Sequence, residues 1–187
     1  MLRRTALSVH TISNAAIASG ALALAENYVL TREAFVDYLD RLTPDGVLYV
    51  VRPEAQMARL VATGRESLAV RGVVDPAGHF YLYHHPSSAP RGQLVAPNRS
   101  SFRAGFLMKK SPFTPEEVHR IQAHLGRTVE LLYSPLEPRA GSLYHALLTA
   151  PDPRTVYATQ EAQLAPTTDD RPFFNQHMRW SRITLTT

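Results

Sequence analysis

Residues Glu26 to Val51, ENYVLTREAFVDYLDRLTPDGVLYVV, predict a helix, a tight turn and a buried strand in succession. Thr31 is a favoured N-cap residue, and apolar side chains then recur on one helical face: Ala34, Phe35, Tyr38, Leu39 and Leu42. The turn sequence Thr43-Pro44-Asp45-Gly46 stops the helix. The apolar run Val47 to Val51 is typical of a strand covered on both faces. Because these elements form half of a βαβ crossover, the sequence predicts an α/β fold.

The chain after this stretch continues the alternation of helix and strand. Pro53 is placed to begin a helix that runs through Met57 to Val70 and is weakened by Gly64. Two β-prone segments follow, Phe80 to His84 and Phe102 to Lys109, and we expect them to pair antiparallel.

The last third of the chain carries one strong helix signal. Thr114-Pro115-Glu116-Glu117 is a capping box with proline at the first helical position, and Gly126 closes this helix. A short strand over Thr128 to Tyr133 and a helix over Ser142 to Thr149 are predicted next. The segment from Pro151 to Thr168 is expected to be rich in loops.

Composition excludes several classes of function. The 187 residues carry a formal charge of only +4, and their Lys and Arg are scattered, so nucleic-acid binding is not indicated. The absence of cysteine excludes disulfides, thiolate catalysis and Cys-ligated zinc. The eight histidines show no ligand spacing such as HExxH, and no metal is therefore expected.

The amino terminus allows two interpretations. Arg3-Arg4 precedes an uncharged stretch from Thr5 to Ala25, which imitates a secretory signal or a membrane anchor. Polar residues such as His10 and Asn14 interrupt that stretch, which favours an internal loop and helix entry instead.

Several segments resemble one known family, the spermidine synthase-like proteins of the class I S-adenosylmethionine-dependent methyltransferase superfamily. The family segment SGAxxLxENYLxTxEAFxxYLxxLxPxGxL is matched in register by these residues: Ser19-Gly20-Ala21, Leu24, Glu26-Asn27-Tyr28, Thr31, Glu33-Ala34-Phe35, Tyr38-Leu39, Leu42, Pro44 and Gly46-Val47-Leu48. FLMKKSPFTPEEV (Phe106 to Val118) and TDDRPFF (Thr168 to Phe174) extend the likeness. It is greatest to the large, membrane-embedded members of the family.

The resemblance implies a partial Rossmann-like methyltransferase sheet. In the family the strands lie in the order three, two, one, four, five, seven, six. Val47 to Val51 then corresponds to strand five, Phe80 to His84 to strand six and Phe102 to Lys109 to strand seven. Strands one to three are missing, strand four is missing or reduced to a few residues, and GxGxxG does not occur. Residues 1–110 would be the carboxy-terminal half of the domain, and residues 111–187 a helical, loop-rich extension packed on it.

Half a sheet has an unsatisfied edge. Strand five would lack its neighbour and leave unpaired N–H and C=O groups along a hydrophobic border. The apolar faces of its helix and strand would also lack part of their cover. We therefore expect a partner chain that carries the first half, self-association, or poor solubility.

The resemblance also implies candidate site residues. The aspartate that serves the family as general base is replaced here by His10, which is either a base near neutral pH or a surface residue of a decayed site. Glu26 and Tyr28 match positions that line the polyamine side of the pocket. Alternatively, Glu26 caps the helix entry and Tyr28 belongs to the core. Asp169-Asp170-Arg171 is expected to be an ion-paired turn that anchors the tail.

By resemblance, the function is that of an aminopropyltransferase-related domain, which transfers an aminopropyl group from decarboxylated S-adenosylmethionine to a polyamine. We expect no independent catalysis and no cofactor in this chain alone, because the cofactor-binding half is missing. The alternatives are a non-catalytic interaction domain that docks on a membrane or split-domain partner, and an S-adenosylmethionine-dependent methyltransferase. The sequence indicates a soluble or cytoplasmic protein, and the family resemblance indicates membrane association.

Overall fold

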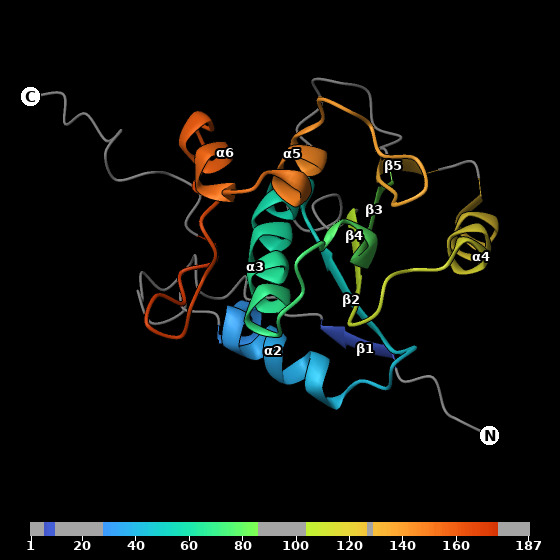
Figure 1. Cartoon of the computed structure of the whole chain (residues 1–187), viewed down its shortest axis with the longest axis horizontal. Coiled ribbons are helices and arrows are strands. Elements are labelled where there is room, and N and C mark those ends of the chain that lie inside the picture. Colours follow the sequence, from blue (N-terminus) through green and yellow to red (C-terminus); the bar gives the residue numbers. More distant parts are fainter. Residues whose placement is uncertain (1–5, 10–27, 86–103, 127–128, 176–187) are drawn as a thin grey trace, which may run out of the picture.

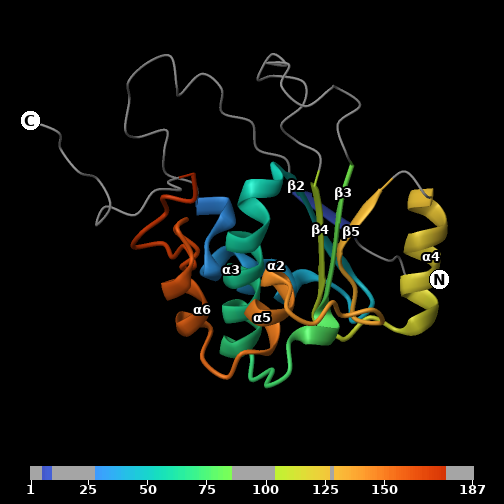
Figure 2. The ribbon, with the colours of Figure 1, turned by 90° about the horizontal axis from the view of Figure 1, so that it is seen from above.

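In the computed structural model, the described residues are 6–9, with backbone only, and 28–85, 104–126 and 129–175. They form an open sheet with helices on both faces, which confirms the predicted α/β class. Figure 1 shows helices α2 (Arg32–Arg41), α3 (Met57–Val70) and α5 (Leu143–Thr149) on one side. Figure 2 shows that, among the described helices, α4 (Pro115–Leu125) lies by itself on the other face of the sheet.

Within the described residues, the sheet has five strands in the order β1-β2-β4-β3-β5. Their bounds are Ala6–Val9 for β1, Val47–Arg52 for β2, Phe80–His84 for β3, Ala104–Lys109 for β4 and Glu130–Tyr133 for β5. β1 is parallel to β2, and the other neighbours are antiparallel. The antiparallel pairing expected between β3 and β4 is confirmed, and β4 lies between β2 and β3.

The expectation that strand five has no neighbour is corrected. β1 pairs with β2 from Ala6 opposite Val47 to Val9 opposite Val50, so four residues cover the edge of β2. The open border of the described sheet on this side is consequently the outer edge of β1. On the opposite side β5 extends the sheet beyond β3, so the carboxy-terminal segment contributes a strand as well as helices.

Local sequence explains the two helices that follow the opening stretch. The Thr31 hydroxyl accepts a hydrogen bond from the Ala34 N–H, as expected of the N-cap of α2. A short 3-10 turn, Glu54–Gln56, precedes α3. Gly64 lies inside α3 because a Cβ there would approach the sulfur of Met108 and the ring of Phe80 to 2.9 Å. This glycine lets the helix pack closely on β3 and β4.

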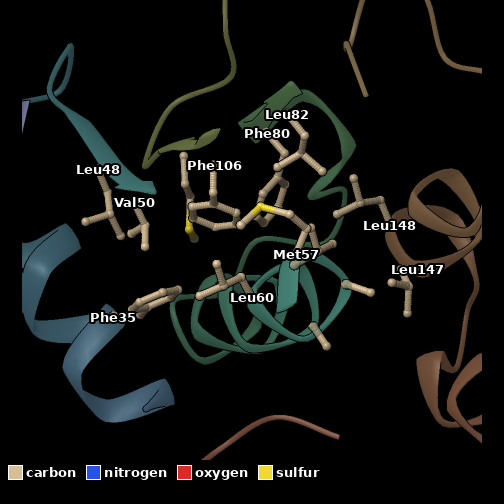
Figure 3. Close-up of a cluster of buried hydrophobic side chains, with 14 of the residues drawn as sticks. Phe35, Leu48, Val50, Met57, Leu60, Phe80, Leu82, Phe106, Leu147 and Leu148 are labelled. Atoms are coloured by element: carbon tan, nitrogen blue, oxygen red, sulfur yellow. The ribbon is translucent and has the colours of Figure 1, made fainter. Parts of the chain in front are cut away.

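The main hydrophobic core fills the space between the sheet and helices α2, α3 and α5. Figure 3 shows the side chains that meet there from these elements: Phe35, Leu48, Val50, Met57, Leu60, Phe80, Leu82, Phe106, Leu147 and Leu148. The two-residue period of β2 sends Leu48 and Val50 into this core. Val47 and Tyr49 belong to a second cluster beneath α4.

The carboxy-terminal elements include one helix that the sequence did not reveal. The capping box of α4 is confirmed, with Thr114 and Glu117 exchanging hydrogen bonds, and α5 begins at the N-cap Ser142 as predicted. The segment expected to be loop-rich contains α6 (Pro153–Thr159), whose N-cap is Asp152. None of the helices in the described part of the chain is both long and apolar enough to cross a bilayer.

Candidate functional site

A pocket of about 560 Å³ lies between α4 and the face of the sheet turned away from α2 and α3. Its lining is mostly apolar and comes from β2, β3, β4 and α4 together with the segments before β2 and α4: Asp45, Val47, Tyr49, Tyr83, Leu107, Phe113, Glu117, Arg120, Ile121, His124 and Leu125. A volume of this size is usual for small-molecule sites, and convergent polar groups on apolar walls are their usual composition.

Two tyrosines place hydroxyl groups together in this pocket. Tyr49 comes from β2 and Tyr83 from β3, and their hydroxyl oxygens are 2.8 Å apart. β4 lies between these strands, and its Gly105 is opposite both Val51 and Tyr83 in the two ladders. A Cβ at Gly105 would collide with the Tyr83 ring, so the glycine lets that ring lie across β4. Burial, and then the hydrogen bond with Tyr49, raise the pKa of Tyr83, so its hydroxyl stays protonated at neutral pH.

A buried ion pair fixes the start of α4 against the sheet. Lys109 ends β4 with a side chain only 2% exposed, and its Nζ lies 2.7 Å from both carboxylate oxygens of Glu117. The ammonium also lies 5.4 Å from the centre of the Phe113 ring. Burial raises the pKa of Glu117, but the hydrogen bonds from Lys109 and the Thr114 N–H outweigh it and hold that pKa below the ordinary value.

Of the catalytic and substrate-binding residues proposed from the resemblance, only Tyr28 belongs to the described part of the chain, and it does not line this pocket. His10 and Glu26 lie outside the described residues; β1 ends just before His10, at Val9. Tyr28 begins the short 3-10 turn Tyr28–Leu30 ahead of α2 and is 54% exposed, so it is not a core residue. Its helix covers the opposite face of the sheet, which separates Tyr28 from the hydroxyl pair.

A second cluster joins the carboxyl end of β2 to the segment after α6. Arg59 in α3 is buried and donates hydrogen bonds to the carbonyl oxygens of Ala165, Phe173 and Phe174 at 2.8–3.0 Å. Arg59 and Arg52 approach the Phe174 ring to 5.8 and 6.0 Å from its centre. Burial lowers the pKa of Arg59 to about 10, which still leaves it charged at neutral pH.

The turn that contains Asp169 is tied to the start of α2 by hydrogen bonds. The Thr31 hydroxyl lies 2.6 Å from the Asp169 carboxylate, and the Asp169 N–H donates to Glu33 Oε2 at 3.1 Å. The Arg32 N–H donates to the Thr167 carbonyl at 2.8 Å. The ion pairs found in the described residues do not include Asp169, Asp170 or Arg171, so the turn is anchored by these hydrogen bonds instead of the expected ion pairing.

Sequence reasoning missed the hydroxyl pair, although one signal for it was present. A glycine inside a strand pattern often marks a close approach of another group to the backbone, and Gly105 interrupts a strand that is apolar up to Lys109. Which side chain approaches Gly105 depends on the order of the strands in the sheet. That order cannot be deduced from the two tyrosines alone. Within the described residues, no group of three or more His, Cys, Asp or Glu side chains is placed to hold a metal ion.

A scan against protein-family models, a search of curated proteins and a search of solved structures found no match to this chain. The class of the protein is consequently defined by its fold alone, which is α/β with an open, mixed sheet.

Proposed function

We propose that the chain is the carboxy-terminal half of a spermidine synthase-like domain of the class I methyltransferase superfamily. The order and direction of the strands carry this proposal. β1, β2, β4 and β3 follow one another in the sheet, with the first pair parallel and β4 antiparallel to both its neighbours. This is the order four, five, seven, six that the resemblance implies, and α3 is the crossover between the parallel strands five and six.

The position of the open edge supports the same proposal. In the implied sheet, strands one, two and three continue beyond strand four, which corresponds to β1. Within the described residues no strand pairs with the outer edge of β1, and this is the edge that would receive them. The partner would be a chain carrying the nucleoside-binding half, or a second copy of this chain.

The chain by itself would not transfer an aminopropyl group. Ligands of open α/β sheets bind at the carboxyl ends of the parallel strands, and no glycine-rich loop is present to hold a nucleoside there.

Calorimetric titration and an aminopropyl-transfer assay test the proposal. The purified chain is titrated with S-adenosylmethionine, its decarboxylated form and methylthioadenosine, after circular dichroism has shown that the sample is folded. We expect no micromolar binding and no turnover. Robust aminopropyl transfer by the chain alone would refute the half-domain, and methylation from S-adenosylmethionine would replace it with the methyltransferase alternative.

Hydrogen exchange and sedimentation test the open edge. We expect slow exchange of the β4 amides, which lie in the middle of the sheet, and fast exchange in β1 in a dilute monomer. Concentration-dependent association that protects β1 would support docking at this edge. A monomer at all concentrations with β1 as protected as β4 would contradict it.

A further inference from the structure

We propose that the pocket between α4 and the sheet binds a neutral, mainly apolar small molecule that carries one hydrogen-bond acceptor. The site is separate from the carboxyl edge of the sheet, where the half-domain proposal places nucleoside chemistry. The pocket proposal can therefore be correct or wrong whatever the outcome for the half-domain proposal. Four observations carry it: the volume, the hydroxyl pair, the balance of charges and the rigidity of the walls.

The walls provide the apolar part of the site. Val47 and Leu107 form part of the sheet side, and Ile121 and Leu125 form part of the helix side. Each of them is only partly buried by the protein itself. A ligand in the space of about 560 Å³ would remove more of their apolar surface from water, which is the main favourable term for binding.

The hydroxyl pair provides the polar contact. Tyr49 and Tyr83 each carry one O–H, and one of these two protons is used in the 2.8 Å hydrogen bond between them. Neither hydroxyl makes another hydrogen bond within the described residues, so the second proton has no partner there. Because the donor is set among apolar side chains, an acceptor on the ligand would satisfy a group that is otherwise costly to desolvate.

The charges that line the pocket select a neutral ligand. Glu117 is neutralised by Lys109 at 2.7 Å. With the lining residue His124 counted as neutral, the remaining formal charges are one anion, Asp45, and one cation, Arg120. These two charges sum to zero, so neither an anionic nor a cationic ligand gains a net electrostatic attraction. A charged ligand would nevertheless lose its hydration on entering, which disfavours it.

The walls are held in place before any ligand arrives. The Lys109–Glu117 pair and the capping box of Thr114 fix the first turn of α4. Because Gly105 has no side chain, the Tyr83 ring lies directly against β4. A site formed in advance avoids the entropy cost of ordering side chains on binding.

Four probes with the same phenyl-plus-four-carbon composition separate the contributions to binding. These are butylbenzene, which has no acceptor, butyrophenone, which adds a carbonyl, phenylbutyrate, which is anionic, and phenylbutylamine, which is cationic. Titrations of the full chain are followed by amide chemical shifts. We expect butyrophenone to bind most tightly and to perturb β2, β4 and α4, with an advantage of roughly two- to tenfold over butylbenzene.

Tyrosine variants test the role of the hydroxyls. In the double variant Tyr49→Phe, Tyr83→Phe, butyrophenone and butylbenzene should bind equally well, because only the donors are removed. Either single variant should retain most of the preference for butyrophenone over butylbenzene, since the remaining tyrosine hydroxyl still has a proton to donate. Tyr28→Phe, an exposed tyrosine outside the pocket, is the control and should leave all affinities unchanged.

Filling the pocket tests its location from both walls. Leu107→Trp fills it from the sheet and Ile121→Trp from the helix, and each should reduce the binding of all probes at least tenfold in a sample with unchanged circular dichroism. The proposal is overturned if folded wild-type chain binds none of the probes, if a charged probe binds best, or if the carbonyl preference survives in the double phenylalanine variant.

Discussion

The hydroxyl oxygen of Thr31 lies 2.6 Å from Oδ1 of Asp169, across a separation of 138 residues in the chain. The same hydroxyl accepts a hydrogen bond from the Ala34 N–H at 3.2 Å. One side chain therefore caps α2 and holds the turn that follows α6.

Thr31→Ala should lower the free energy of unfolding by about 2 kcal/mol. About half of this reflects the lost helix cap, and the rest reflects the lost contact with Asp169. Urea denaturation measures the change, and Thr31→Ser is the matched control because it keeps the hydroxyl. In a double-mutant cycle with Asp169→Ala, the two losses should be non-additive by at least about 0.5 kcal/mol. Full additivity would mean that the contact contributes nothing.

Arg59→Ala should destabilise the chain by about 3 kcal/mol, because three carbonyl oxygens would lose their hydrogen bonds from this buried guanidinium group. Arg59→Lys should restore little of this loss, since an ammonium lacks the planar fork that reaches carbonyls in different directions. Thermal and urea unfolding measure both variants. Arg154→Ala, at an exposed arginine, is the control. Equal stability of the lysine variant and the wild type would contradict the role given to the guanidinium.

Gly105→Ala should cost about 2 kcal/mol of stability, because the added methyl group collides with the ring of Tyr83. The same substitution made together with Tyr83→Ala should cost nothing further or should stabilise, since alanine suits a strand better than glycine does. Urea denaturation of the single and double variants gives both numbers. If Gly105→Ala is equally costly in both backgrounds, the glycine is needed for some reason other than the ring.

Glu117→Gln should reduce stability at pH 7 by about 2 kcal/mol, because it leaves the buried Lys109 ammonium without its counter-charge; the partial exposure of Glu117 keeps the figure below that of a fully buried pair. The pKa of Glu117 in the folded chain is lowered from its ordinary 4.5. Its contribution is therefore complete above pH 4.5 and is lost as the pH falls through the lowered pKa.

The difference between wild type and Glu117→Gln, measured by urea denaturation from pH 7 to pH 3, should consequently shrink at the acid end. Glu116→Gln changes the neighbouring, exposed carboxyl group and is the control for a general effect of charge. A difference that stays constant with pH would show that the lost contact is not an ionic one.

The elements that were predicted correctly carry their own local signals. Thr31 and the capping box at Thr114 determine where two helices begin, and both lie at the predicted positions. α6 was missed although Asp152-Pro153 is a usual helix start, because its seven residues are too few to display a periodic apolar face. For β1 the sequence left open whether a strand is missing or reduced to a few residues, since four apolar or small residues do not distinguish a strand from a loop.

The candidate site was less accessible to sequence reasoning than the helices. Tyr49 and Tyr83 are 34 residues apart, and β4 lies between their strands. Their hydroxyl groups meet across β4 because Gly105 of that strand has no side chain in the way of the Tyr83 ring. That relationship is a property of the tertiary arrangement. The anchoring of Arg59 on main-chain carbonyls was equally hidden, because carbonyl groups have no sequence signature.

The place of β4 also has a consequence for how the chain is made. β2 and β3 leave the ribosome before β4, and neither has its central partner until residues 104–109 follow. At ordinary translation speeds of roughly 5–20 residues per second, the connection of residues 85–103 delays that partner by seconds at most. During this interval the core lacks Phe106 and Met108 of β4, which lie against Gly64 of α3 in the complete sheet. We therefore expect the nascent chain to be most prone to aggregation when elongation pauses between His84 and Ala104.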